Sequence, residues 1–147
     1  MQPQERLTAE EITQLKALAK KYFLEQGLNC GLTMMHCLSD FFQLPVHEQV
    51  YASINGIMEH RAKRHQCGLY KGALMFLGIY GAQLGWSRDQ LNEKTLSLAE
   101  AFEEHFHSIH CYELRSASFD SDPRHDLCAD LAAEAVLFAV GVIKDMK

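Results

Sequence analysis

The sequence predicts an all-α protein, a single-domain bundle of five or six main helices. Two capping-box motifs and apolar residues recurring at helical spacing indicate helix along nearly the whole chain, and only three prolines interrupt it. The length of 147 residues fits one domain of ordinary size. Because neither a linker nor an internal repeat divides the chain, we expect residues 1–147 to form one helical domain with short connecting loops.

The first predicted helix begins after Thr8 and ends near Gly27. Thr8 and Glu11 have the spacing of a capping box, in which the two residues satisfy each other's backbone amides. Apolar side chains between Ile12 and Tyr22 then recur at helical spacing. Gly27 is a typical residue for the end of such a helix.

Two further helices are expected before the middle of the chain. Asn29 is a suitable N-cap for a helix from Cys30 to about Phe42, which ends before Pro45. A third helix is expected from about Val46 to Met58. The polar segment that follows, 59–66, is interpreted as a loop or a solvated helix end.

The fourth predicted helix begins near Cys67, continues to about Tyr80 and is rich in glycine. Glycine weakens a helix, but inside a buried helix it permits a neighbouring backbone to approach closely. The glycines are Gly68, Gly72, Gly78 and Gly81. We therefore expect tight packing here, with this helix and the last one at the centre of the bundle.

Two longer helices complete the prediction. Ser87 and Gln90 form a capping box that opens a helix from Arg88 to about His107. Its expected apolar face consists of Leu91, Leu96, Leu98, Ala99, Phe102 and Phe106. After a short element around Cys111, the pair Asp122-Pro123 is a strong helix start. The last helix is expected from Pro123 to about Asp145, apolar on most sides.

Charge and hydropathy argue against two classes of function. The formal net charge of −5 does not match the basic surface that nucleic-acid binding usually needs. The longest apolar stretch, 131–143, is shorter than a membrane span and contains Glu134. The first six residues also lack the apolar core of a signal peptide. We therefore expect a cytoplasmic protein with no nucleic-acid partner and no membrane insertion.

Four of the five cysteines are candidates for thiol or metal chemistry. Cytosolic cysteines are more often ligands or redox groups than structural disulfides. Cys30, Cys67 and Cys111 fall at predicted helix starts, where the helix dipole stabilises a thiolate. Cys128 is expected one to two turns into the last helix. No Cys-x-x-Cys pair is present, so for each cysteine a buried core position is the alternative.

Three other features each have a functional and a structural interpretation. Cys37 lies two helical turns after Cys30, but its apolar neighbours favour a core position. Three histidines precede Cys111 and could join it in a mixed cysteine/histidine site, with His107 and His110 on one helix face. The alternative is that they lie at a solvated helix end. They are His105, His107 and His110. Residues 60–65 could bind phosphate or an acidic partner, but a solvated loop is the simpler interpretation.

Residues 67–72, Cys-Gly-Leu-Tyr-Lys-Gly, resemble the motif Cys-Gly-Ala-x-x-Gly of a family of small redox-active proteins with four hallmark cysteines. The resemblance extends to Gly27-Leu28-Asn29-Cys30, to Cys111-Tyr112-Glu113-Leu114 and to Cys128 in the last helix. Leu69 stands where the motif has alanine. A bulky basic segment replaces the glycine-rich stretch that precedes the motif in the family.

The resemblance implies that Cys30, Cys67, Cys111 and Cys128 form a redox site or bind a metal. Four thiolates suit either zinc or an iron–sulfur cluster. We favour a [2Fe–2S] cluster, because the resemblance implies a redox function and zinc has no redox chemistry. Basic residues 61–64 would help to offset the negative charge of such a cluster if they lie near Cys67. The partner would be a redox protein that the sequence does not identify.

Two alternative functions stay open. The chain could be a metal-free thiol/disulfide oxidoreductase with Cys67 as nucleophile, its pKa depressed by the helix N-terminus. It could also be a structural or interaction module with a zinc site, and a homodimer is compatible with that interpretation.

Overall fold

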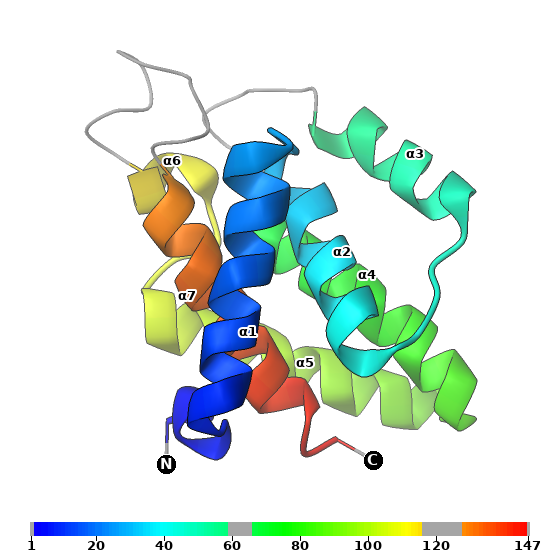
Figure 1. Ribbon diagram of the computed structural model, residues 1–147. Coiled ribbons are helices and arrows are strands. Elements are labelled where there is room, and N and C mark those ends of the chain that lie inside the picture. Colours follow the sequence, from blue (N-terminus) through cyan, green and yellow to red (C-terminus); the bar gives the residue numbers. More distant parts are fainter. Residues whose placement is uncertain (1, 59–65, 116–127, 147) are drawn as a thin grey trace.

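The computed structural model describes residues 2–58, 66–115 and 128–146, and over these residues the predicted all-α class is confirmed (Figure 1). The α-helices are α1 (Ala9–Ala19), α2 (Cys30–Phe42), α3 (Glu48–Met58), α4 (Gly68–Leu84), α5 (Arg88–Phe106), α6 (Cys111–Arg115) and α7 (Ala129–Ile143). A 3-10 helix, η1 (Pro3–Arg6), precedes α1, and a π-helix, η2 (Lys20–Glu25), continues it.

The helix starts predicted from local motifs are present. Thr8 Oγ1 accepts a hydrogen bond from the Glu11 amide at 3.0 Å, and the Glu11 carboxylate accepts one from the Thr8 amide at 2.9 Å. Ser87 and Gln90 make the same reciprocal pair at the start of α5. The side chain of Asn29 accepts a hydrogen bond from an amide in the first turn of α2. These caps satisfy amides that a helix cannot pair internally.

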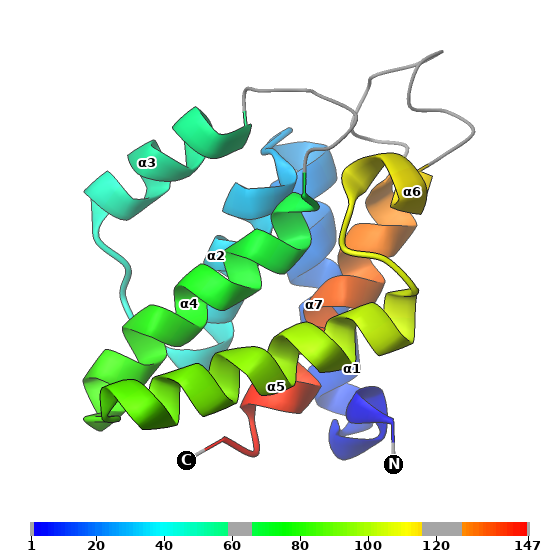
Figure 2. The same cartoon turned by 180° about the vertical axis from the view of Figure 1, so that it is seen from behind.

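The centre of the bundle consists of α2, α4 and α7 (Figure 2). Ten of the fifteen residues of α7 are buried, as the apolar sequence predicts. A Cβ atom added at Gly72 would lie 3.0 Å from the carbonyl oxygen of Gly31, so the backbones of α4 and α2 approach closely there. Gly78 has no atom within 4 Å of that position. The close-approach prediction is therefore confirmed at Gly72 and wrong at Gly78.

Two predictions about the second half of the chain are wrong. The helix α7 begins at Ala129 with Cys128 as its N-cap, so Cys128 does not lie inside the helix. The predicted start signal at residues 122–123 lies outside the described residues. The sequence after it is apolar throughout, so it does not show at which residue the helix begins. In α5, Leu96 is 58% exposed. Leu98, two positions later, is buried, because residues two apart lie on opposite sides of a helix.

The two ends of the chain lie at the same end of the bundle (Figure 1). There η1 packs against α7, and a Cβ atom at Gly141 would overlap the carbonyl group of Pro3, so only glycine permits this packing. Within the described residues, no helix combines the length and apolar character that crossing a membrane requires.

Candidate functional site

All four cysteines of the predicted site lie at the start of a helix. Cys30 is the first residue of α2 and Cys111 the first residue of α6, while Cys67 and Cys128 are the N-caps of α4 and α7. The starts of these helices lie at the same end of the bundle, the upper end in both ribbon views (Figures 1 and 2). Four segments that are distant in sequence therefore each present a cysteine at one end of the fold.

A short backbone pairing holds Cys67 close to the segment that leads into α6. The amide of Cys67 donates a hydrogen bond of 2.7 Å to the carbonyl oxygen of Ile109. The flanking residues Gln66 and His110 form an isolated antiparallel bridge. Since Cys111 directly follows His110, the bridge fixes the backbones of Cys67 and Cys111 near each other.

The other two cysteines reach the same region from α2 and α7. A Cβ atom added at Gly68, the residue after Cys67, would lie 2.9 Å from the Cβ of Cys30. Cys111 and Cys128 both lie close enough to Cys67 to disfavour its thiolate electrostatically. The structure therefore places Cys111 and Cys128 within electrostatic reach of Cys67, and Cys30 against the first turn of α4.

Burial separates these four thiols into two kinds. Cys67 is 3% exposed and Cys128 is 5% exposed, whereas Cys30 and Cys111 are half-buried. Burial raises the pKa of the Cys67 thiol to about 12, and Cys111 and Cys128 act in the same direction. The amides of Leu69 and Tyr70 oppose this shift without overcoming it. The prediction that the helix N-terminus depresses the pKa of Cys67 is therefore wrong.

The donor atoms suit a soft metal, but the described residues do not form a closed ligand set. Within 2–58, 66–115 and 128–146, no three groups among cysteine, histidine, aspartate and glutamate stand close enough to hold one metal ion. Sulfur donors of this kind are typical of zinc and iron–sulfur sites. The assignment of Cys30, Cys67, Cys111 and Cys128 as metal ligands thus stays a prediction, and filling such a site would require the thiols to move closer together.

His110, which pairs with Gln66 and directly precedes Cys111, has a buried ring nitrogen. Its Nδ1 atom has no hydrogen-bond partner among the described residues. A buried polar atom without a partner is costly and calls for an explanation. His107, by contrast, ends α5 with a φ angle of 69°. The expectation that His107 and His110 share a helix face is therefore wrong, because α5 ends before either residue.

Cys37 does not belong to this group. It is fully buried in α2 among apolar side chains, as its neighbours in the sequence predict. Burial raises the pKa of its thiol to about 12, and the nearby Asp40 carboxylate adds to the shift. The core interpretation of Cys37 is therefore confirmed. The basic residues 60–65, with their expected roles beside Cys67 or at a phosphate, lie outside the described residues.

One comparison with known proteins gave a match. The model of a family described as "Putative redox-active protein (C_GCAxxG_C_C)" matches residues 28–142. The chain belongs to this family. The matched range contains all four cysteines that the sequence resemblance identified, in the order that the family's description gives. No curated protein and no solved structure matched the chain.

The chain departs from the motif in the family's description around Cys67. That motif reads Gly-Cys-Ala-x-x-Gly, with its first glycine before the cysteine rather than after it as in the expected Cys-Gly-Ala-x-x-Gly. Counted from Cys67, Gln66 stands at the first glycine, Gly68 rather than Leu69 at the alanine, and Lys71 at the last glycine, one residue before Gly72. Gln66 supplies one half of the bridge to His110, and Gly68 leaves room for Cys30. Two of the departing residues, Gln66 and Gly68, therefore lie against the segments that carry Cys111 and Cys30.

Lys71 is a residue of the site that sequence reasoning did not single out. It lies one turn after Cys67 in α4 and is half-buried. Burial lowers the pKa of its ammonium group, while Cys67 and Cys111 act to raise it. Its charge is therefore within electrostatic reach of both thiols. The four-residue spacing from Cys67 could have indicated this, because such residues share a helix face.

Proposed function

We propose that this family member is an electron-transfer protein in which Cys30, Cys67, Cys111 and Cys128 bind an iron–sulfur cluster, with [2Fe–2S] favoured. The family's description as "Putative redox-active protein" supports a redox role, and the cluster is the further step. The observation that supports it best is the burial of Cys67 and Cys128 at helix starts that share one end of the bundle.

Burial argues against the metal-free alternative with Cys67 as nucleophile. Thiol–disulfide exchange needs an accessible thiolate, and reactive cysteines are typically partly exposed. Cys67 is 3% exposed, so a disulfide substrate cannot approach it without local opening. A metal ligand has no such requirement, since a buried thiol that coordinates a metal is deprotonated outright.

The surrounding residues have distinct roles under this proposal. The bridge between Gln66 and His110 keeps the backbones of Cys67 and Cys111 together. Lys71 places a positive charge near both thiols and offsets part of the negative charge of four thiolates. When bound, the cluster would supply one-electron transfer. The proposal includes a reducing compartment such as the cytoplasm and a redox partner protein.

An assay of iron and acid-labile sulfide on protein purified without oxygen, after supported cluster assembly, tests the proposal. We expect iron and sulfide in near-equal amounts and a visible absorption spectrum. Cys67→Ser and Cys128→Ser should lose both, because each removes a sulfur ligand. Cys37→Ala is the matched control, since it removes a buried thiol of α2 outside the group and should retain the cluster.

The same assay separates the alternatives. Wild-type protein that carries neither iron nor sulfide after assembly would refute the cluster. Tightly bound zinc that is lost on Cys67→Ser would indicate the zinc-binding module instead. Loss of iron from Cys37→Ala as complete as from Cys67→Ser would show that the wrong cysteines have been assigned. Whether the protein forms the homodimer that is compatible with the zinc-module interpretation is a separate question, which the mass of the protein in solution would answer.

A further inference from the structure

A second site lies away from the cysteines, between η1, α5 and α7. It is a cavity of about 640 Å³, a volume within the range of small-molecule sites. Phe138 and Val142 contribute to its wall from α7. They follow Cys128 by ten residues or more, which corresponds to at least about 15 Å along the helix. The cavity is therefore distinct from the cysteine end.

Three residues that can bind an anion line this cavity. Arg6 comes from η1, and His105 and His107 come from the end of α5. Glu104 is the acidic residue of the lining. Arginine is always charged, and its planar fork matches a carboxylate bidentately. Glu104 in the lining and Asp145 beside Arg6 are two nearby carboxylates, and they disfavour a dianion more than a monoanion.

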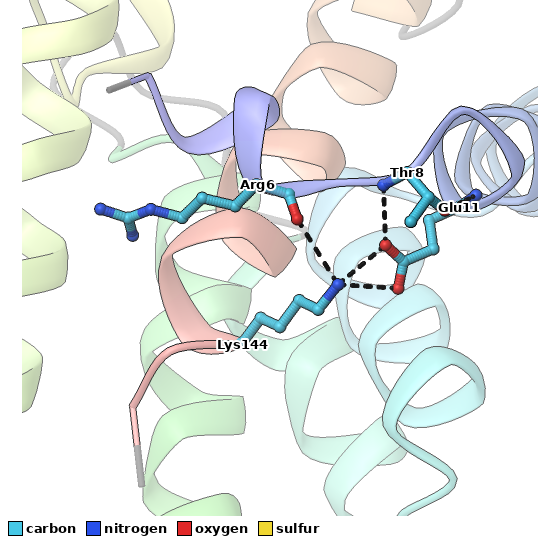
Figure 3. Close-up of polar contacts among 4 residues, drawn as sticks. All are labelled: Arg6, Thr8, Glu11 and Lys144. Carbon is cyan, nitrogen blue, oxygen red and sulfur yellow. Dashed lines mark hydrogen bonds and ion pairs between the residues drawn. The ribbon is translucent and has the colours of Figure 1, made fainter.

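Contacts to α7 hold the guanidinium of Arg6 in place. Its Nη1 atom donates to the carbonyl oxygen of Gly141 at 3.3 Å, and its Nε atom pairs with the Asp145 carboxylate at 3.1 Å. These contacts occupy two of the five donor hydrogens of a guanidinium. The Arg6 side chain extends away from the neighbouring Lys144–Glu11 pair (Figure 3). The Asp145 side chain is 58% exposed, so water weakens that ion pair.

Apart from the polar side chains of Gln2 and Ser97, the rest of the wall is apolar, and aromatic rings pack around His105. The ring of His105 lies 4.9 Å from that of Phe138 and 4.7 Å from that of Phe106, between centroids. Val142 and Ala101 extend the apolar wall. A ligand suited to this lining carries a negative charge and a short apolar portion.

We propose that this cavity binds a small organic carboxylate, with the carboxylate on Arg6 and the imidazoles and the apolar part against Phe138 and Val142. The site does not depend on the cysteines or on any cluster that they bind. Its ligand would therefore be recognised equally well by protein in which Cys67 is replaced by serine, provided that variant folds.

Titration of ¹⁵N-labelled protein with butyrate, in a buffer free of other carboxylates and of phosphate, tests the proposal by amide chemical shifts. We expect saturable shifts in η1, in residues 101–107 and in residues 138–142. Arg6→Gln should weaken binding by about tenfold or more, because it removes a charge-assisted hydrogen bond. Ala101→Phe should block binding while leaving every charged group in place.

Arg88→Gln is the matched control, because it removes the same charge from the exposed first turn of α5. It should leave butyrate affinity unchanged. Shifts that do not saturate, or equal weakening by Arg88→Gln and Arg6→Gln, would overturn the proposal, since both indicate diffuse attraction. Binding that survives Ala101→Phe would exclude the cavity. Inorganic phosphate binding as tightly as butyrate would overturn the carboxylate assignment.

Discussion

The cysteines show that the same backbone position gives different thiol chemistry in different surroundings. Each of the four begins a helix, where exposed amides favour a thiolate by a typical 0.3–1 kcal/mol, roughly. Complete burial costs a charged group much more, up to several pKa units. For Cys67 burial dominates, and its pKa rises to about 12. Cys30 and Cys111, which are half-buried, lack such complete desolvation.

This difference predicts the order of alkylation of metal-free protein at neutral pH. Cys30 and Cys111 should react with iodoacetamide first, and Cys37 and Cys67 should react slowest. A thiol with a pKa about three units above its ordinary value of 9.0 has about a thousandfold less thiolate. Mass spectrometry of peptides after timed quenching would measure the order.

A control in denaturant removes the difference in burial, so all five cysteines should then react at similar rates. Cys67 reacting as fast as Cys111 in the native protein would contradict the buried environment that we describe.

The residue chemistry of the site was only partly predictable from the sequence. The four cysteines could be identified because their order and local motifs are features of the sequence itself. The spacing of Lys71 from Cys67 and the position of His110 just before Cys111 are also features of the sequence. What the sequence does not show is that both residues lie beside Cys67, because that depends on which segments pack there. The bridge between Gln66 and His110 joins distant parts of the chain and leaves no periodic pattern. Burial of Cys67 is likewise a property of the packed fold.

At the scale of elements, Gly72 permits a close approach of the α2 and α4 backbones. A Cβ atom at Gly72 would lie 3.0 Å from the Gly31 carbonyl oxygen and 3.1 Å from the Cβ of Met34. Both partners belong to α2, whose first residue is Cys30. The distance between these helices therefore affects the position of one cysteine relative to the α4 start.

Two alanine substitutions in α4 should have opposite effects on stability. Gly72→Ala should lower the free energy of unfolding by about 1–3 kcal/mol, because the methyl group forces the helices apart. Gly78→Ala should raise it by about 0.5–1 kcal/mol, because that position has space and alanine favours helix. Urea denaturation of both variants measures the difference. Two changes of the same sign would contradict the close approach at Gly72.

Helix starts were predictable where a local motif determines them. Thr8, Asn29 and Ser87 cap their helices through side chains that are visible in the sequence. The start of α7 was mispredicted, since Cys128 caps it without a side-chain hydrogen bond. The exposure of Leu96 was also missed, because the sequence shows apolar residues without showing how narrow the buried stripe of α5 is.

At the scale of the whole molecule, the fold closes by joining the start of the chain to its end. Lys144, just after α7, donates to both carboxylate oxygens of Glu11 at 2.8 and 3.0 Å, and to the carbonyl oxygen of Arg6 at 3.5 Å (Figure 3). Glu11 also completes the capping box of α1. One carboxylate therefore caps the first long helix and binds the last one.

This closure predicts a stability that depends on pH. Lys144 and the Thr8 amide lower the pKa of Glu11 below its ordinary value of 4.5. A depressed pKa contributes stability above that value and loses it as the pH falls through the pKa of the folded protein. Glu11→Gln should therefore reduce the free energy of unfolding by about 1 kcal/mol at neutral pH. Urea denaturation across the acidic range would measure the change.

The difference between wild type and Glu11→Gln should shrink as the pH falls below 4.5 and through the lowered pKa of Glu11, because protonation of Glu11 in the wild type then weakens the same contacts. Glu10→Gln is the matched control, since it removes an exposed carboxylate from the same first turn and keeps the ion pair between Glu11 and Lys144. It should change stability by less than about 0.5 kcal/mol at any pH. A Glu11→Gln effect that is equally large at low pH would show that lost packing, rather than the charged link between the chain ends, causes it.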